Sequence, residues 1–518
     1  MKKIIISFKV VLVTLLLIGV GTQQSCTKLD EEVYSDITGD KLFEDPDNLI
    51  YAFGTAYTNL YQVFGHKYGI GMDAGTDILC VPQRGGDWLD GGEWHRWHRL
   101  TYTPSEAYVG RWWNTIFYGV NTCNRLIFQF EALEDVDVTP AVSELRALRA
   151  LYYYWLIDIY GNVPIQTEFN VPADFKPSTK SRQEVYEFIE SELLAVMPHL
   201  SKKTGLDYFG RMNYYAAQMV LAKLYLNAEV YTGTAQWEKA SMACDSIMTG
   251  NFSLTPNFFT NFEEDATTSP EYILGIAFDQ VSAPVFEIHL FTLHYNLQDK
   301  YKLEEATWNG LSIQESLYNS FEDVDTRRNG LLTGPQFYAD GTPVEDPSYE
   351  KFNPQNPTAP IDPDGAPLNL TPVINMLEPN CLRQAGARVA KFPFIEGSDR
   401  YTSNDYPIFR YADVLLMKAE ALMRSGGDMG TAMSLVNQVR SRAGATALGE
   451  LNYEILLAER GRELYAEGFR RSDMIRFGVY LDTRWEKPEV SPSHVTLWPI
   501  PEAQIQANGN LQQNFGYN

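Results

Sequence analysis

The sequence predicts a mainly α-helical protein with an irregular middle region. Apolar residues recur at helical spacing over residues 143–160 and again over residues 181–197. Residues 213–248 and 410–442 each have the pattern of two helices joined by a short turn. Between them, residues 251–404 are rich in Pro, Gly, Asn and Asp, a composition that disfavours regular structure. We therefore expect a helical scaffold on both sides of a loop-rich region.

The first 26 residues have the layout of a bacterial secretory signal. Three lysines precede an apolar run of about 11 residues, which is shorter than the roughly 20 that a bilayer-spanning helix needs. Cys26 follows almost at once, as in lipoprotein signals, where the leader is cut just before a cysteine that is then acylated. We expect residues 1–25 to be removed and Cys26 to carry the lipid. Plain secretion is the alternative.

Charge and cysteine content exclude several classes of protein. The formal net charge is −24, and loss of the leader removes three lysines and no acids, which makes it −27. Such an acidic chain repels nucleic acid and anionic membrane surfaces. The later cysteines are far apart and form no CxxC pair, so we expect buried thiols rather than disulfides or a zinc site. They are Cys80, Cys123, Cys244 and Cys381.

The individual helices have recognisable ends. The helix predicted over residues 143–160 stops at Gly161, and Val163-Pro164 then leads the chain away. The helix over residues 181–197 ends at Pro198. The two predicted helix pairs have small residues where paired helices approach closely, and their repeat length of about 34 residues matches tetratricopeptide repeats.

A glycine-rich loop over residues 84–98 contains the densest group of unusual side chains. Sugars present apolar faces that stack on aromatic rings, and hydroxyl rims that need donors and acceptors. The glycine pairs at 85–86 and 91–92 argue against a buried strand or helix here, so we expect some of the tryptophan rings to be exposed. The candidate ligand contacts in this loop are Arg84, Asp87, Trp88, Trp94, His95 and Trp97.

Other aromatic residues have competing interpretations. Trp97 is equally consistent with a core position, and Trp112-Trp113 fit packing on a helix better than a site. A second aromatic set in the middle region is a further candidate for ligand stacking, with loop packing as the alternative for each residue. It comprises Tyr295, Tyr301, Trp308 and Tyr338.

Motifs for catalysis, metals or nucleotides are absent from the sequence, so we expect no cofactor. His95 and His98 lack the glutamate of a zinc-hydrolase HExxH motif, and residues 362–365 form only a fragment of a calcium loop. Glu459, Glu463 and Glu467 lie four residues apart among arginines, which predicts an ion-paired network. A glycoside hydrolase needs only two positioned carboxylates, so that class stays open.

Five segments in order resemble the SusD/RagB family of outer-membrane lipoproteins. They are the leader with Cys26-Thr-Lys-Leu-Asp, the run from Ser143 through Tyr152 to Tyr160-Gly-Asn-Val-Pro164, Tyr406-Pro-Ile-Phe-Arg to Glu420, Glu459 to Arg470, and Leu497-Trp-Pro-Ile-Pro501 with Leu511 to Tyr517. The resemblance implies a single-domain helical scaffold over residues 41–518, with four tetratricopeptide-like helix pairs. Within it, residues 41–250 and 405–518 would be mainly helical and residues 251–404 the irregular insert.

The resemblance also implies a function and a location. Family members capture nutrients for a SusC-like TonB-dependent transporter in the outer membrane. We therefore expect a lipid-anchored, non-catalytic protein that binds an oligosaccharide, with a peptide ligand as the alternative within the family and a surface glycosidase as the alternative outside it. Residues 26–40 would form the tether, whose acids Asp30, Glu31 and Glu32 resemble a surface-export signal or serve only to solvate it.

Overall fold

The computed structural model describes residues 49–346 and 368–517. From Ile50 onwards the chain forms one compact unit. The expected leader, the lipidated Cys26, the tether and the fragment at residues 362–365 lie outside the described residues. The division of the chain into leader, tether and domain therefore stays a prediction.

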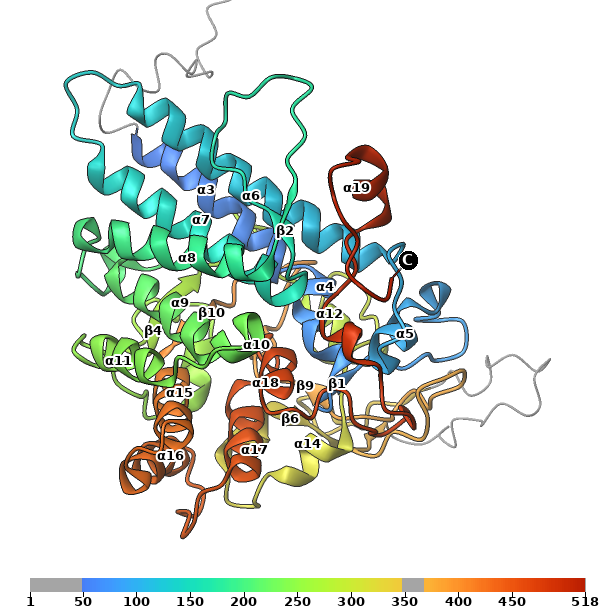
Figure 1. Ribbon diagram of the computed structural model, residues 1–518. Helices are drawn as coiled ribbons and strands as arrows, with labels where there is room; N and C mark the ends of the chain where they lie inside the picture. Colours follow the sequence, from blue (N-terminus) through green and yellow to red (C-terminus); the bar gives the residue numbers. More distant parts are fainter. Residues whose placement is uncertain (1–48, 347–367, 518) are drawn as a thin grey trace, which may run out of the picture. The chain divides into compact units, whose positions relative to one another are not determined.

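Helices make up most of the regular structure, as the sequence predicts (Figure 1). The longer helices are α3 (Leu49–Phe64), α6 (Ala107–Glu131), α7 (Thr139–Ile159), α8 (Arg182–Val196), α9 (Tyr214–Leu226), α11 (Trp237–Met248), α15 (Tyr411–Arg424), α16 (Met429–Arg442) and α17 (Tyr453–Leu464). The shorter helices are α4 (Lys67–Ile70), α5 (Glu93–Arg99), α10 (Ala228–Thr232), α12 (Ile288–Thr292), α13 (Leu297–Lys300), α14 (Glu315–Ser320), α18 (Arg470–Arg476) and α19 (Glu502–Ala507).

Strands are short and occur only as antiparallel pairs within the described residues. The pairs are β1 (Leu79–Cys80) with β5 (Ser312–Ile313), β2 (Val163–Pro164) with β3 (Thr179–Lys180), β4 (Tyr272–Ile276) with β10 (Tyr406–Arg410), β6 (Leu331–Leu332) with β9 (Arg388–Val389), and β7 (Gly334–Pro335) with β8 (Asn369–Leu370). The β4–β10 pair joins the start of the middle region to the strand that leads into α15. This pairing brings the two helical parts of the chain together.

Successive helices pack side by side. Helix α7 lies between α6 and α8, and α11 lies between α9 and α15, which also packs on α16 (Figure 1). Gly119 allows the close approach of α6 to α7, because a Cβ there would lie 2.4 Å from the Tyr152 ring. Both helix pairs predicted from the sequence are present, as α9–α11 and α15–α16. The implied set of four tetratricopeptide-like pairs stays a prediction.

Local signals explain the helix ends. Ser181 caps α8 by accepting a hydrogen bond from the backbone of Glu184, whose side chain reaches back to the Ser181 backbone.

Several expectations about buried side chains are met. The buried Trp112 and Trp113 confirm the packing interpretation of that pair. The four cysteines that follow Cys26 are buried and unbridged, as predicted. None of the described helices has the length and hydropathy needed to cross a membrane.

The glutamates at helical spacing form the predicted ion-paired network. Glu459, Glu463 and Glu467 are buried on α17 and just beyond it. Arg462 of the same helix pairs with Glu459. The other partners come from other segments: Arg327, Lys391, Arg410, Arg440 and Arg442. Each carboxylate contacts at least two cations, which compensates for the loss of hydration on burial. The cluster therefore holds the middle region against the C-terminal helices.

Asp405 lacks such compensation. Its side chain is 1% exposed and accepts a hydrogen bond from the backbone N–H of Ala266 at 2.8 Å. Burial, with some repulsion from Asp265, raises its pKa to about 7. The folded state therefore binds this proton more tightly than the unfolded chain does, and the free energy of unfolding falls as pH rises from about 4 to 7.

Asp405→Asn is expected to remove this loss of stability. The variant should match the parent protein near pH 4 and exceed it by about 3 kcal/mol above pH 8, because an amide needs no ionisation. Urea unfolding at both pH values measures the difference. The exposed Asp174 provides the control, since Asp174→Asn should change nothing at either pH. An equal effect of Asp405→Asn at both pH values would contradict the argument.

Candidate functional site

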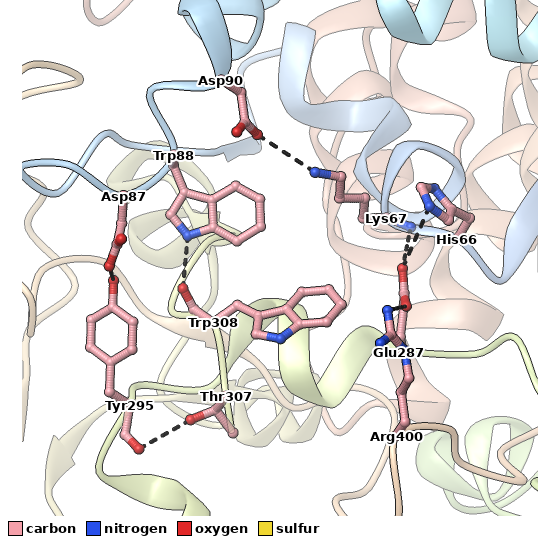
Figure 2. Close-up of a pocket in the computed structure, with 10 residues that line it drawn as sticks. All are labelled: His66, Lys67, Asp87, Trp88, Asp90, Glu287, Tyr295, Thr307, Trp308 and Arg400. Atoms are coloured by element: carbon pink, nitrogen blue, oxygen red, sulfur yellow. Dashed lines mark hydrogen bonds and ion pairs between the residues drawn. The ribbon is translucent and has the colours of Figure 1, made fainter. Parts of the chain in front are cut away.

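A cavity of about 420 Å³ opens where residues 66–90 meet the middle region. Its walls come from the start of α4, the loop after β1, both ends of α12, the approach to β5 and the segment before β10 (Figure 2). The lining residues are His66, Lys67, Asp87, Trp88, Asp90, Glu287, Tyr295, Thr307, Trp308 and Arg400. Aromatic rings and charged groups therefore share one cavity.

Trp88 is held in place by its surroundings. Its backbone has φ 61°, in the left-handed region that non-glycine residues seldom adopt. The indole N–H donates to the carbonyl of Trp308 at 2.7 Å, and the ring packs on Phe291 with centroids 5.1 Å apart. Gly310 makes room for it, because a Cβ there would lie 2.4 Å from the indole. The half-buried ring is thus a rigid wall of the cavity.

Trp308 forms the adjoining aromatic wall. Its ring is half-buried and tilted by 48° to that of Trp88, with centroids 6.5 Å apart. The guanidinium of Arg400 lies 5.8 Å from the Trp308 ring centroid. In Figure 2 the six-membered rings of both indoles point toward the side where Lys67 and Glu287 lie. This pair offers an apolar surface of the kind on which a sugar ring stacks.

Hydrogen-bonding groups stand beside the tryptophans. The Tyr295 hydroxyl donates to the Asp87 carboxylate at 2.5 Å, and burial together with this bond raises the pKa of Tyr295. The guanidinium of Arg383 lies 4.3 Å from the Tyr295 ring centroid. The Thr307 hydroxyl donates to the carbonyl of His294 at 2.8 Å. Asp87 is exposed and keeps acceptor capacity for a ligand.

A charged cluster closes the other side. The buried Glu287 accepts a hydrogen bond from the backbone of Lys67 at 3.1 Å and lies 3.7 Å from Arg400. Burial raises the pKa of Glu287, although these neighbours favour its charge. Burial and the nearby cations Arg111, Lys67 and Arg400 lower the pKa of His66 to about 4, so His66 is neutral at pH 7. Lys67 pairs with Asp90 at 3.5 Å and lies 5.3 Å from the Trp88 ring centroid.

Four of the ten candidate ligand contacts named from the sequence line this cavity. Asp87 and Trp88 come from the glycine-rich loop, and Tyr295 and Trp308 come from the middle region. These two regions are more than 200 residues apart in the chain. The hydrogen bonds Trp88–Trp308 and Tyr295–Asp87 connect them directly.

The expectation of an exposed ring is wrong for Trp94. Residues Glu93–Arg99 form α5, because Gly91 and Gly92 adopt left-handed conformations that turn the chain into a helix start. Trp94 is 1% exposed and stacks on Trp97, which is fully buried between Trp94 and Tyr108. The glycine pair therefore precedes a helix that buries its aromatic face, and the core interpretation of Trp97 is confirmed.

Arg84 and His95 are also buried and engaged elsewhere. Arg84 donates to the carbonyls of Asn309 and Ala385 at 2.7 and 2.9 Å, which ties the loops around the cavity together. His95 pairs with Glu378 at 2.7 Å. Both side chains lie outside the cavity lining, so neither contributes to the site proposed below.

Several lining residues escaped the sequence analysis. Lys67, Glu287 and Arg400 belong to none of the motifs found in the sequence, and only the fold places them together. The isolated His66-Lys67 pair just after an amphipathic helix is the one signal that could have suggested them. Among the residues that the structure describes, no three His, Cys, Asp or Glu side chains gather as a metal site.

Two family models match separate parts of the chain. One, described as the SusD family, matches residues 385–495. The other, described as "Starch-binding associating with outer membrane", matches residues 87–226 and so includes Asp87 and Trp88.

Individual proteins match over most of the chain. The starch-binding protein SusD of Bacteroides thetaiotaomicron is 26% identical over 81% of this chain and 80% of its own length. The SusD-like protein P25 of Formosa agariphila is also 26% identical, over 74% of this chain and 76% of its own. Surface glycan-binding protein A of B. thetaiotaomicron, solved with laminarihexaose, has the same fold, with a TM-score of 0.71 and 21% identity over 90% of this chain and 99% of its own. Two segments of the chain therefore match SusD-family models, and most of its length is similar to SusD and SusD-like proteins.

Proposed function

We propose that this protein binds oligosaccharides at the bacterial surface and delivers them to a TonB-dependent outer-membrane transporter. The observation that carries the proposal is the cavity itself, in which Trp88 and Trp308 form an aromatic corner beside Asp87, Tyr295 and Lys67. Aromatic faces with neighbouring donors and acceptors suit the apolar faces and hydroxyl rims of sugars.

The relatives support this ligand class and location. One relative is named as a starch-binding protein, and one protein of the same fold was solved with laminarihexaose. The family description that matches residues 87–226 refers to association with the outer membrane. We further propose that Cys26 carries the lipid anchor and that the partner is a SusC-like transporter.

Binding without catalysis is the mode that the cavity favours. Its carboxylates are already engaged: Asp87 with Tyr295, Asp90 with Lys67, and Glu287 with Lys67 and Arg400. A glycosidase needs one free acid and one free base or nucleophile on opposite sides of the sugar bond. We therefore propose a non-catalytic role.

Titration of the purified protein with neutral oligosaccharides, acidic oligosaccharides and short peptides tests the proposal. We expect saturable binding of at least one oligosaccharide class, with the sugar recovered intact after a day. Peptide binding without sugar binding would favour the alternative within the family. Product release that disappears in Glu287→Gln would move the protein to the glycosidase class.

A further inference from the structure

A second cavity of about 440 Å³ lies along α6 and shares no lining residue with the first. Its walls are one face of α6, the loop between β2 and β3, and the C-terminal segment with α19. Figure 1 shows α19, in red, beside α6 and the β2–β3 loop. Leu511, which belongs to the C-terminal motif noted in the sequence, lines this cavity.

The walls are tied together by hydrogen bonds. The Gln504 amide of α19 donates to Asn114 of α6 at 3.0 Å. The Asn508 amide donates to the carbonyl of Pro177 in the β2–β3 loop at 2.9 Å. Because these bonds join three segments from distant parts of the chain, the cavity exists without a ligand. A preformed cavity of this size is typical of small-molecule sites.

One wall combines apolar rings with free polar groups. Phe117 is half-buried and packs on the buried Trp113, with centroids 4.6 Å apart. The next residue, Tyr118, is 65% exposed. Within the described part of the chain, neither the Tyr118 hydroxyl nor the exposed Asn121 amide has a hydrogen-bond partner. This wall therefore offers aromatic faces for stacking and, beside them, donors and acceptors that are free to bond a ligand.

The two cavities differ sharply in charge. The first has six acidic or basic side chains in its lining, whereas the second is lined only by aromatic, aliphatic, proline and amide side chains. A charged ligand entering the second cavity would lose hydration without meeting an opposite charge. In a chain of net charge −24, this uncharged lining selects a neutral ligand.

We propose that this second cavity is an additional binding site for a neutral oligosaccharide. The inference rests on the proposed function for its ligand class and goes beyond it by assigning a separate site. Amides and a phenol that both donate and accept hydrogen bonds match sugar hydroxyls, and Phe117 and Tyr118 supply the stacking surface. A chain with two sites would hold a long glycan at two points, which raises its overall affinity through effective concentration.

Titration of the purified protein with laminarihexaose and maltohexaose tests the second site. The variant Trp308→Ala should weaken the first site at least thirty-fold, so that the second site accounts for the remaining binding. Adding Tyr118→Ala to Trp308→Ala should reduce that remaining affinity at least tenfold, and Asn121→Ala should reduce it less. The remaining binding should not change with salt, because no charged side chain lines the cavity. Phe128→Ala is the matched control, since Phe128 is a 47% exposed aromatic on the same helix but outside the cavity.

Each other outcome has a definite meaning. Absence of remaining binding in Trp308→Ala at sugar concentrations up to about 10 mM would overturn the second site and leave the first intact. Remaining binding that survives Tyr118→Ala would also overturn it. Loss of all sugar binding on Tyr118→Ala alone would support the second site and contradict the first. If Tyr118→Ala leaves sugar binding unchanged but releases the transporter in purification from native membranes, the cavity is a protein-binding surface and the proposal fails.

Discussion

Replacing Glu463 by Ala is expected to lower the free energy of unfolding by about 3–5 kcal/mol. Glu463 is fully buried, and its carboxylate pairs with Arg410 and Arg442 and, at 2.8 Å, with Arg327. Burial alone would raise the pKa of Glu463, but the three guanidiniums hold it well below its usual value. Removing this carboxylate leaves the guanidiniums buried with less negative charge to balance them. A buried charge without its partner strongly destabilises the folded state.

Urea unfolding followed by the helical circular-dichroism signal measures the effect. Glu463→Gln keeps the volume and removes only the charge, so it should still cost most of this stability. Glu454→Gln is the control on the same helix, because Glu454 is exposed and should tolerate the change. A loss below about 1 kcal/mol for both Glu463 variants would mean that the remaining carboxylates suffice for the network.

Replacing Trp308 by Ala is expected to weaken oligosaccharide binding at least thirty-fold, or about 2 kcal/mol. The change removes one of the two aromatic walls of the first cavity. It keeps the backbone carbonyl that accepts the Trp88 hydrogen bond, so Trp88 stays in position. Because the Trp308 ring is only half-buried, the fold should persist. Titration calorimetry and the melting temperature separate the two effects.

Other tryptophans provide the comparisons for this variant. Trp237→Ala removes a half-buried tryptophan far from the cavity lining and should leave binding unchanged. Trp94→Ala should reduce stability, because the ring lies in the core between Trp88, Trp97 and Phe291. Trp88→Ala should reduce both affinity and stability, since its ring packs on Phe291 and also faces the cavity. Unchanged affinity in Trp308→Ala would place the sugar site elsewhere.

Helices and their ends could be read from the sequence because their causes are local. Spacing of apolar residues, the Ser181 cap and the breaks at Gly233 and Ser425 act within a few residues of each other. The ion-paired network was predictable for a related reason, since Glu459, Glu463 and Glu467 recur every four residues among arginines, a spacing that favours ion pairs. The structure places Glu467 just beyond the end of α17.

The composition of the site depended on contacts between distant segments. Sequence could nominate Trp88 and Trp308 as stacking residues, but it could not show that Gly310 admits the Trp88 ring or that Arg400 and Glu287 close the cavity. It also misjudged Trp94, because a glycine pair permits either an exposed loop or the turn before a helix. The outcome depends on whether other aromatic side chains are present for the tryptophan ring to pack against. Trp97, Tyr108 and Phe291 form that packing surface only in the folded chain. Local patterns thus determine the elements, while the exposure of a side chain depends on what packs against it.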